Sequence, residues 1–384
     1  MIFLSRTHVD RKRICWITSD SFVDTDLNFT NMCEIAKLFD IHWIILFGKS
    51  NNRFKENDFE PLQKAVSNIS IEFMYSSYRI RNPKNILFYC QLGKKIKKLN
   101  SDVVYLNVSV NSPWMLPLFF SLDSKCLIMT AHQGEVHIGM EHKWLTNTLR
   151  RIVYSRMNNV NMFSKSQAAL FMKHFPKIKI FQIPLPLKNF GKANQLADKD
   201  KRVVRFLSFG AINFAKNIDL LIDAGCKLYE KGYRNFNISI NGMCKDWRFY
   251  QERIKYPEIF DINIRSIDNS EIPNLFSRSH YLVQPYRVVS QSGPTKIAFY
   301  YHTPIIATNL PGFSDEISEG INGFLFQNED VDDLVRVMEE AVNRSQDEYN
   351  KLKNSMQHYT ELHYSPWQIA SKYIDMFKAV LSIE

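Results

Sequence analysis

Short apolar runs alternate with amphipathic stretches along most of this 384-residue chain. In the first half, apolar runs at 13–20, 42–48, 102–109 and 125–132 have polar residues on both sides and helical patterns between them. Near-continuous apolar strands that alternate with helices are typical of parallel sheets covered on both faces. The pattern therefore predicts an α/β, doubly wound, Rossmann-like domain.

The second half repeats the alternation. An apolar run at 203–210 precedes a helical pattern at 217–232 and another apolar run at 235–242. Farther on, the run at 281–286 leads into a turn, and we expect a helix from about Lys296 to Tyr301. Ligands of such sheets collect beyond the carboxyl ends of the strands, so we look for chemistry there.

Composition marks the domain boundaries. Residues 188–202, KNFGKANQLADKDKR, are rich in Gly, Asn and Lys and carry no strand pattern, which indicates a linker. We therefore expect an N-terminal domain at 1–187 and a second domain at 203–363. An amphipathic segment, SPWQIASKYIDMFKAVL, predicts a helix within 364–384.

Charge is concentrated in the first half. Residues 1–185 hold 25 Lys and Arg against 14 Asp and Glu, whereas residues 186–384 hold 24 against 25. Basic clusters at 94–98 and at Arg150-Arg151 lie in expected helices. Such a face suits an anionic membrane surface, at about 1 kcal/mol per well-placed Lys or Arg, or a lipid diphosphate; a merely solvated helix face is the alternative. No nucleic-acid-binding module is recognisable, so we predict no nucleic-acid partner.

We expect a cytoplasmic protein, peripheral on the inner face of the membrane where the basic half meets lipid. No window approaches the ~20 uninterrupted apolar residues of a spanning helix. The N-terminus shows no secretory signal pattern. The six cysteines form no C-x-x-C pair, which favours reduced thiols.

The strongest chemical signal is the turn Gln291-Ser292-Gly293-Pro294-Thr295, just before the expected helix. A helix N-terminus presents free backbone N–H groups and the positive end of its dipole. Pro294 suits a first helical turn, and Gly293 lets an anion approach the backbone closely. The turn therefore predicts an anion site, most simply for a diphosphate.

The stretch from Gln284 to Phe326 resembles the donor-binding half of bacterial retaining glycosyltransferases of the GT-B fold, in the sequence family numbered four. The matching residues are Pro285-Tyr286, Gln291-Ser292-Gly293, Pro304-Ile305-Ile306, Gly312, Glu316 and Asn322-Gly323. The resemblance implies two Rossmann-like domains that face a cleft. It also implies a C-terminal helix that crosses back to the N-terminal domain.

By the same resemblance, FLSFGAINFAKNIDLL is similar to the family's phosphate-gripping turn, and Lys216 matches its lysine. The family's arginine position holds Ala211, and its following glycine is Asn217. One cation is therefore missing unless Arg287 or another cation replaces it. The residues expected to bind the donor are Gly210, Asn213, Lys216, Gly242, Ile267, Tyr286, Arg287, Gln291, Ser292, Gly293, Pro294, Thr295 and Glu316.

A second departure lies at the Ser-Gly turn. Much of the family carries two glutamates seven residues apart, one facing the transferred sugar and one the ribose. Their expected places are Val288 or Val289 and Lys296 or Ile297, and no residue from 288 to 297 is acidic. A catalytically impaired binding or scaffold protein is therefore an alternative. A nucleotide-sugar epimerase is another, although it needs more acid–base carboxylates than we can place.

On the acceptor side, the run at 125–132 ends at His132, where the resemblance implies a histidine near the transferred sugar. We name His132 and Lys216 as the catalytic candidates. Glu135 would act as base for the acceptor hydroxyl, and His137 would either line the acceptor or be structural. A structural histidine is the alternative for His132, and no strong spacing supports a zinc site of His132, Glu135 and His137.

Asp24-Thr25-Asp26 follows the first apolar run. A D-x-D pair holds a divalent metal in another glycosyltransferase fold, GT-A, but there it ends a central strand of a single nucleotide-binding domain. We place Asp24 and Asp26 on the acceptor side and predict no metal or other cofactor. Cations and helix N-termini can stabilise the departing diphosphate instead.

The expected function is sugar transfer from a nucleotide-diphosphate sugar to an acceptor hydroxyl, with retention of anomeric configuration. The expected partners are the nucleotide-sugar donor and a lipid-linked or saccharide acceptor. The family and the basic first half favour a place in bacterial surface polysaccharide synthesis, as capsule, exopolysaccharide or lipopolysaccharide.

Overall fold

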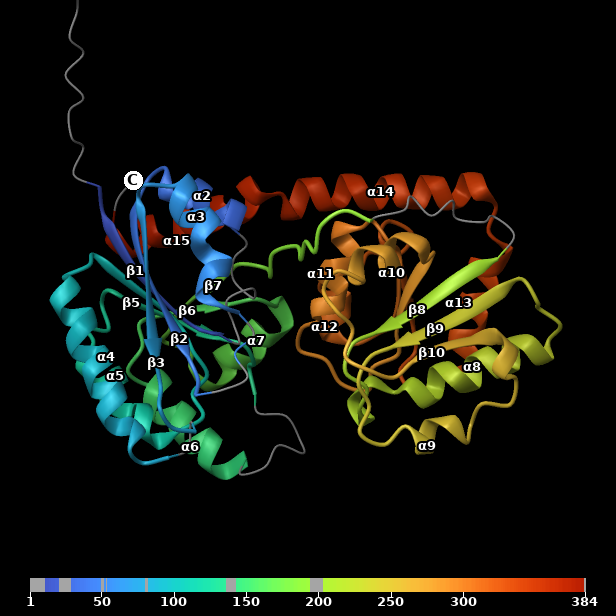
Figure 1. The fold of residues 1–384 in the computed structure, drawn as a ribbon, viewed down its shortest axis with the longest axis horizontal. Helices are drawn as coiled ribbons and strands as arrows, with labels where there is room; N and C mark the ends of the chain where they lie inside the picture. Colours follow the sequence, from blue (N-terminus) through green and yellow to red (C-terminus); the bar gives the residue numbers. More distant parts are fainter. Residues whose placement is uncertain are drawn as a thin grey trace, which may run out of the picture. The chain divides into compact units, whose positions relative to one another are not determined.

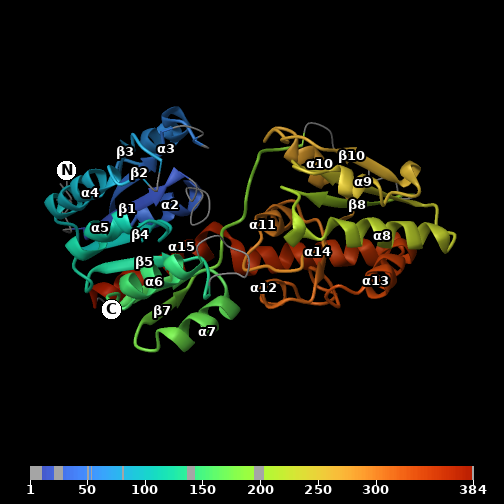
Figure 2. The ribbon, with the colours of Figure 1, turned by 90° about the horizontal axis from the view of Figure 1, so that it is seen from below.

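The computed structural model describes residues 11–20, 29–49, 52, 54–79, 82–135, 143–193 and 203–382. It divides into two compact units (Figures 1 and 2). Unit 1 is Met1–Pro186 with Pro366–Glu384, and unit 2 is Leu187–Ser365. The first boundary lies one residue from the position that the sequence predicts.

Unit 1 is built on a parallel sheet with the strand order β3-β2-β1-β4-β5-β6-β7. The chain starts in the middle of the sheet and winds outward in both directions, which is the predicted doubly wound arrangement. Its strands are β1 (Arg13–Ser19), β2 (Asp40–Phe47), β3 (Ile69–Tyr75), β4 (Val103–Asn107), β5 (Leu127–Ala131), β6 (Asn159–Met162) and β7 (Lys179–Gln182).

Helices cover both faces of this sheet, which is why its central strands are apolar throughout. Residues of α4, α5 and α6 pack in one core cluster with β1, β4 and β5. On the opposite face, the ring of Trp16 lies 5.2 Å from that of Tyr373 on α15. The helices are α2 (Phe29–Ala36), α3 (Glu60–Ala65), α4 (Asn85–Leu99), α5 (Leu116–Ser121), α6 (Lys143–Tyr154), α7 (Lys165–His174) and α15 (Pro366–Leu381), with 3-10 turns η2 (Glu56–Phe59) and η3 (Pro113–Met115).

Unit 2 repeats the design with the strand order β10-β9-β8-β11-β12-β13, again with parallel neighbours. The carboxyl ends of β8, β9 and β11 therefore gather at one edge of the sheet. The strands are β8 (Val204–Phe209), β9 (Phe236–Asn241), β10 (Phe260–Asn263), β11 (Tyr281–Gln284), β12 (Ile305–Thr308) and β13 (Gly323–Phe326).

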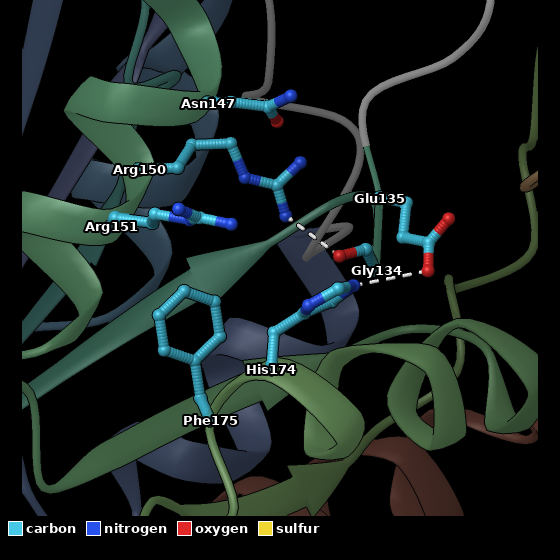
Figure 3. Close-up of a pocket in the computed structure, with 7 residues that line it drawn as sticks. All are labelled: Gly134, Glu135, Asn147, Arg150, Arg151, His174 and Phe175. Atoms are coloured by element: carbon cyan, nitrogen blue, oxygen red, sulfur yellow. Dashed lines mark hydrogen bonds and ion pairs between the residues drawn. The ribbon is translucent and has the colours of Figure 1, made fainter.

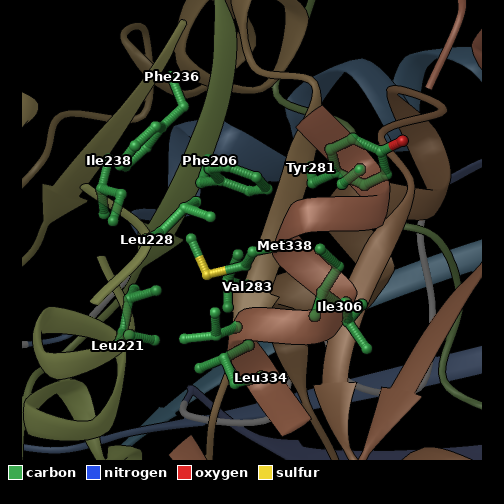
Figure 4. Packing of buried hydrophobic residues seen from close by; sticks show 14 of the residues in the cluster. Phe206, Leu221, Leu228, Phe236, Ile238, Tyr281, Val283, Ile306, Leu334 and Met338 are labelled. Atoms are coloured by element: carbon green, nitrogen blue, oxygen red, sulfur yellow. The ribbon is translucent and has the colours of Figure 1, made fainter. Parts of the chain in front are cut away.

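Figure 4 shows the core on one face of this sheet, where Phe206 and Val283 meet Leu221 of α8 and Met338 of α13. None of the described helices is both long enough and apolar enough to span a bilayer. The helices of unit 2 are α8 (Ile218–Glu230), α9 (Arg248–Gln251), α10 (Ile272–Arg278), α11 (Gly293–Tyr300), α12 (Pro311–Ser314), α13 (Val331–Asn343) and α14 (Gln346–Tyr364), with 3-10 turns η4 (Phe214–Lys216) and η5 (Pro257–Ile259).

The packing of α15 on unit 1 can be tested at Phe377, a fully buried ring that contacts the rings of Trp16 and Phe39. We expect Phe377→Ala to lower the free energy of unfolding of unit 1 by about 3–5 kcal/mol, because it leaves a cavity. Denaturant titration followed by tryptophan fluorescence measures the change. Asp375→Ala, at an exposed position of the same helix, is the control and should cost under about 0.5 kcal/mol. Equal costs for the two variants would refute the packing role.

Candidate functional site

The predicted anion turn lies at the start of α11, which begins at Gly293 rather than near Lys296. The helix starts earlier because Ser292 is its N-cap, and its Oγ accepts a hydrogen bond from the Thr295 amide at 3.4 Å. Pro294 has no N–H group to offer. The expectation of several free amides is therefore corrected. Within the described chain, the Gly293 N–H lacks an acceptor and remains available to an anion.

A buried glutamine connects this turn to the end of β11. Gln284 is 1% exposed, and its Nε2 donates to the Oγ of Ser292 at 2.6 Å and to the hydroxyl of Tyr286 at 3.1 Å. Its Oε1 accepts from the Thr295 hydroxyl at 2.7 Å. Both amide atoms are thus bonded, and the first turn of α11 is locked to the strand that precedes it. Gln284 is thus hydrogen-bonded to three predicted site residues, Tyr286, Ser292 and Thr295. It was not itself predicted, because in the sequence it resembles an ordinary strand residue.

Lys216 lies next to this network. Its Nζ is 3.6 Å from the centre of the Tyr286 ring, a cation–π contact that holds the ammonium at the edge of the sheet. Asn213 starts the turn η4 by accepting a hydrogen bond from the Ala215 amide at 3.1 Å. Asn217 replaces the family's glycine with a φ of 53°, a left-handed conformation that asparagine tolerates better than most residues.

Two of the predicted glycines permit a close backbone approach. A Cβ atom on Gly242 would lie 1.9 Å from the carbonyl oxygen of Gly210, so no other residue fits there. Gly210 has a φ of 114°, and a Cβ atom on it would contact the Pro294 ring at 3.8 Å. The turn after β8 and the start of α11 are therefore neighbours. Ile267 lies half-buried beyond the end of β10.

Arg287, one candidate to replace the missing cation, is already paired within the protein. Its guanidinium donates to the carboxylate of Asp219 at 2.7 Å, to that of Glu329 at 3.1 Å and to the carbonyl of Phe214 at 2.7 Å. Burial opposes its charge, but these carboxylates outweigh burial and raise the pKa of Arg287. Two acidic partners neutralise the arginine, and its role is to hold η4 in place.

Lys188, from the segment read as a linker, supplies a cation that the sequence reading missed. A Cβ atom on Gly293 would lie 3.7 Å from the Nζ of Lys188. The Lys188 amide donates to the carbonyl of Lys296 at 3.3 Å, and the Phe190 amide donates to the hydroxyl of Tyr301 at 3.3 Å. The described part of the linker is thus anchored along α11, with an ammonium group beside the anion turn. A lysine in a polar linker gives no local signal of this placement.

Glu316, predicted to bind the donor, has a partner within the protein. Its carboxylate pairs with the Nζ of Lys296 at 2.5 Å, and Lys296 is fully buried. The hydroxyl of Tyr364, the last residue of α14, lies 3.2 Å from the same Nζ. Burial lowers the pKa of Lys296, and the contact with Glu316 opposes this shift. The ion pair joins α11 to the segment after α12, and the contact with Tyr364 joins α11 to α14.

In unit 1, His132 follows β5 at the carboxyl edge of the sheet. Its Nε2 lies 2.9 Å from the Oδ1 of Asn107, which also accepts from the Thr130 hydroxyl at 2.7 Å. An amide oxygen only accepts, so His132 carries its proton on Nε2. Burial lowers the pKa of His132 to about 4, and the imidazole is neutral at pH 7.

Beside this strand end is a cavity of about 230 Å³, which we call the α6–α7 cavity (Figure 3). The Nε2 of His174 lies 3.0 Å from the Oε1 of Glu135, so the proposed acceptor base already has a partner. Arg150 donates to the carbonyls of Gln133 and Gly134 at 2.5 and 3.1 Å, which fixes the loop after His132. The lining residues are Gly134, Glu135, Asn147, Arg150, Arg151, His174 and Phe175.

The remaining acceptor-side candidates, Asp24, Asp26 and His137, lie outside the described residues. Over the part of the chain that the structure covers, no group of three or more His, Cys, Asp or Glu side chains is arranged to hold a metal ion. Gln291 lies half-buried in the loop before α11.

Comparisons with known proteins bear on both units. Residues 190–360 match the model of the family described as Glycosyl transferases group 1. An uncharacterized 41.2 kDa protein in the cps region of Klebsiella pneumoniae is 25% identical over 113 residues. That match covers 29% of this chain and 31% of the relative, so the chain aligns with under a third of the relative's length.

Solved structures match over nearly the whole chain. A glycosyltransferase from Rickettsia africae has a TM-score of 0.72 at 17% identity, with 98% of this chain and 100% of that chain covered. HepE from Anabaena, solved with UDP and glucose, has a TM-score of 0.68 at 12% identity, with 96% and 100% covered. The expected fold is confirmed: this chain has the GT-B fold, and its residues 190–360 match the model of the group 1 glycosyl transferases.

Proposed function

We propose that this protein transfers a sugar from a nucleoside-diphosphate sugar to an acceptor hydroxyl with retention of configuration. The observation that carries the proposal is the edge of unit 2 where Lys188 lies beside Gly293 and Lys216 lies over the ring of Tyr286, next to the turn that Gln284 holds. In the proposed complex the Gly293 N–H and the two ammonium groups bind the diphosphate. Its charge grows as the sugar departs, and fixed cations stabilise that charge without a metal.

Unit 1 would supply the acceptor side. His132 is neutral at pH 7, and its Nε2 donates to Asn107. In the proposed complex its side chain lies near a hydroxyl of the transferred sugar or of the acceptor. In this proposal His132 orients a hydroxyl and does not act as a cation, because burial keeps it unprotonated at pH 7.

The biological setting proposed is bacterial surface polysaccharide synthesis, at the cytoplasmic face of the membrane. The relative from the cps region of Klebsiella pneumoniae supports a capsule-type product. The UDP and glucose bound to HepE support a UDP-sugar as the first donor to test.

A second candidate is a binding protein without transferase activity. It is favoured by one observation: from 288 to 297 the anion turn has no carboxylate, and Glu316 is paired with Lys296. Both candidates bind a nucleoside diphosphate, but only the transferase turns over a donor. Product analysis by NMR, which reads the anomeric configuration, separates the two candidates and tests retention.

Nucleotide binding is the first test. We expect UDP, at about 100 times its Kd, to stabilise the protein by about 2.7 kcal/mol and to raise the melting temperature by roughly 5–10 °C. Differential scanning fluorimetry with UDP, GDP, ADP and CDP measures the shift. No shift with any of the four would contradict both candidates.

The two lysines are the second test. Lys188→Ala and Lys216→Ala should each weaken UDP binding about tenfold or more, because each removes a charge-assisted contact to phosphate. Isothermal titration calorimetry measures the affinity. Lys255→Ala is the matched control, because Lys255 pairs with Glu230 at the far end of α8. Unchanged affinity in Lys188→Ala would remove Lys188 from the donor site.

The protonation of His132 is the third test. In the unfolded chain its pKa is about 6.5, and in the folded protein it is about 4. Between these values the unfolded state binds more protons, so stability falls as pH drops from 6.5 to 4, by up to about 3 kcal/mol. Urea titrations at several pH values should show this loss in the natural protein and its absence in His132→Asn. Parallel pH curves for the two proteins would show that His132 titrates normally.

A further inference from the structure

Two neighbouring arginines of α6 line the α6–α7 cavity. Arg150 is fixed by two carbonyl groups, and Arg151 beside it also lines the cavity. Neither guanidinium pairs with a carboxylate among the residues that the structure describes. Glu135, the acidic residue of the lining, is paired with His174. Two like charges that share a concave site repel each other, and an anion between them relieves the repulsion.

Arginine is suited to this task. Its planar fork of N–H donors binds phosphate oxygens in pairs, and Figure 3 shows Arg150 and Arg151 extending from α6 toward the Gly134–Glu135 segment. Asn147 adds an amide donor to the same lining. The surrounding part of the chain also has a net positive charge, since residues 79–185 hold 16 Lys and Arg against 4 Asp and Glu.

The size of the cavity limits its occupant. Pockets that enclose a whole small ligand measure roughly 300–1,000 Å³, whereas this one measures about 230 Å³. It therefore fits one charged group of a larger molecule, and the rest of that molecule must lie on the adjoining surface.

The adjoining surface of α6 is apolar. Trp144 is 77% exposed, and it precedes Asn147 and Arg151 by three and seven residues. At 3.6 residues per turn, positions i, i+3 and i+7 lie on one face of a helix, so Trp144 shares the face that lines the cavity. Leu145 and Ile152 are also exposed, at 38% and 37%. An aromatic and aliphatic surface beside an anion pocket matches a phosphorylated lipid.

We propose that the α6–α7 cavity is an acceptor subsite that binds a phosphoryl group carried on an apolar chain. The phosphate contacts Arg151, Asn147 and the exposed edge of Arg150, and the chain lies along Trp144. This inference rests on the proposed function, because it assigns a lipid-linked phosphate or diphosphate as the acceptor class.

The test is binding of a soluble model lipid, geranyl diphosphate, measured by calorimetry without any sugar donor. We expect Arg151→Gln to weaken binding about tenfold or more, because it removes one charge-assisted phosphate contact. Trp144→Ala should weaken binding of geranyl diphosphate but leave inorganic pyrophosphate unaffected. Arg156→Gln is the matched control: it removes the same charge from an exposed arginine just after α6 that does not line the cavity.

Further binding measurements distinguish this site from the donor site and from general binding to a membrane. Lys216→Ala should retain geranyl diphosphate binding, and Arg151→Gln should retain UDP binding, so either proposal can fail alone. Equal loss in Arg151→Gln and Arg156→Gln, or geraniol binding as well as geranyl diphosphate, would overturn the subsite. So would binding to phosphatidylglycerol vesicles without binding of the soluble diphosphate, because that result assigns the charge to a bilayer surface.

Discussion

The candidate donor site depends on one buried side chain. Gln284 ends β11, and its amide bonds Ser292, Thr295 and Tyr286 at distances of 2.6–3.1 Å. A buried amide without partners costs about 1–3 kcal/mol per unsatisfied group, so this arrangement tolerates little rearrangement. Because Ser292 is also the N-cap of α11, the same amide fixes where the helix starts. The ring of Tyr286 in turn makes a cation–π contact with the ammonium group of Lys216. The position of the anion turn is therefore fixed by hydrogen bonds to the end of β11 and does not depend on an exposed loop.

The sheets were predictable because their strands are buried on both faces. β1, β5 and β8 all fall within apolar runs that the pattern marks, with ends displaced by at most two residues. The start of α11 was placed too late, because Ser292 was not recognised as its N-cap. The burial of Lys296 was not predictable, because its partner Glu316 lies 20 positions away. α14 went unnoticed because polar residues surround its buried positions. Its capping box, Ser345 with Glu348, was a usable local signal.

The donor-site residues also divide into those that local sequence predicts and those that depend on distant partners. Lys216 and Ser292 belong to short motifs, so local sequence was enough to single them out as candidates. The status of Arg287 was not predictable, because its carboxylate partners Asp219 and Glu329 lie 68 and 42 residues away. Lys188 was hidden for the same reason: its position depends on how the start of unit 2 runs along α11. Local sequence identifies a charge, but only the fold shows whether that charge is already neutralised.

The ion pairs of Lys296 and Arg287 help to interpret the departures from the family pattern. Near the second expected glutamate position this chain has Lys296, and a buried ammonium is stable only with a counter-charge. Glu316 supplies it. Arg287 is neutralised by Asp219 and Glu329 and no longer adds positive charge. Lys188 lies beside Gly293 of the anion turn, Lys216 lies over the ring of Tyr286, and no residue from 288 to 297 is acidic. The proposed donor site therefore takes its candidate cations from these two lysines and not from the family's arginine position, which holds Ala211.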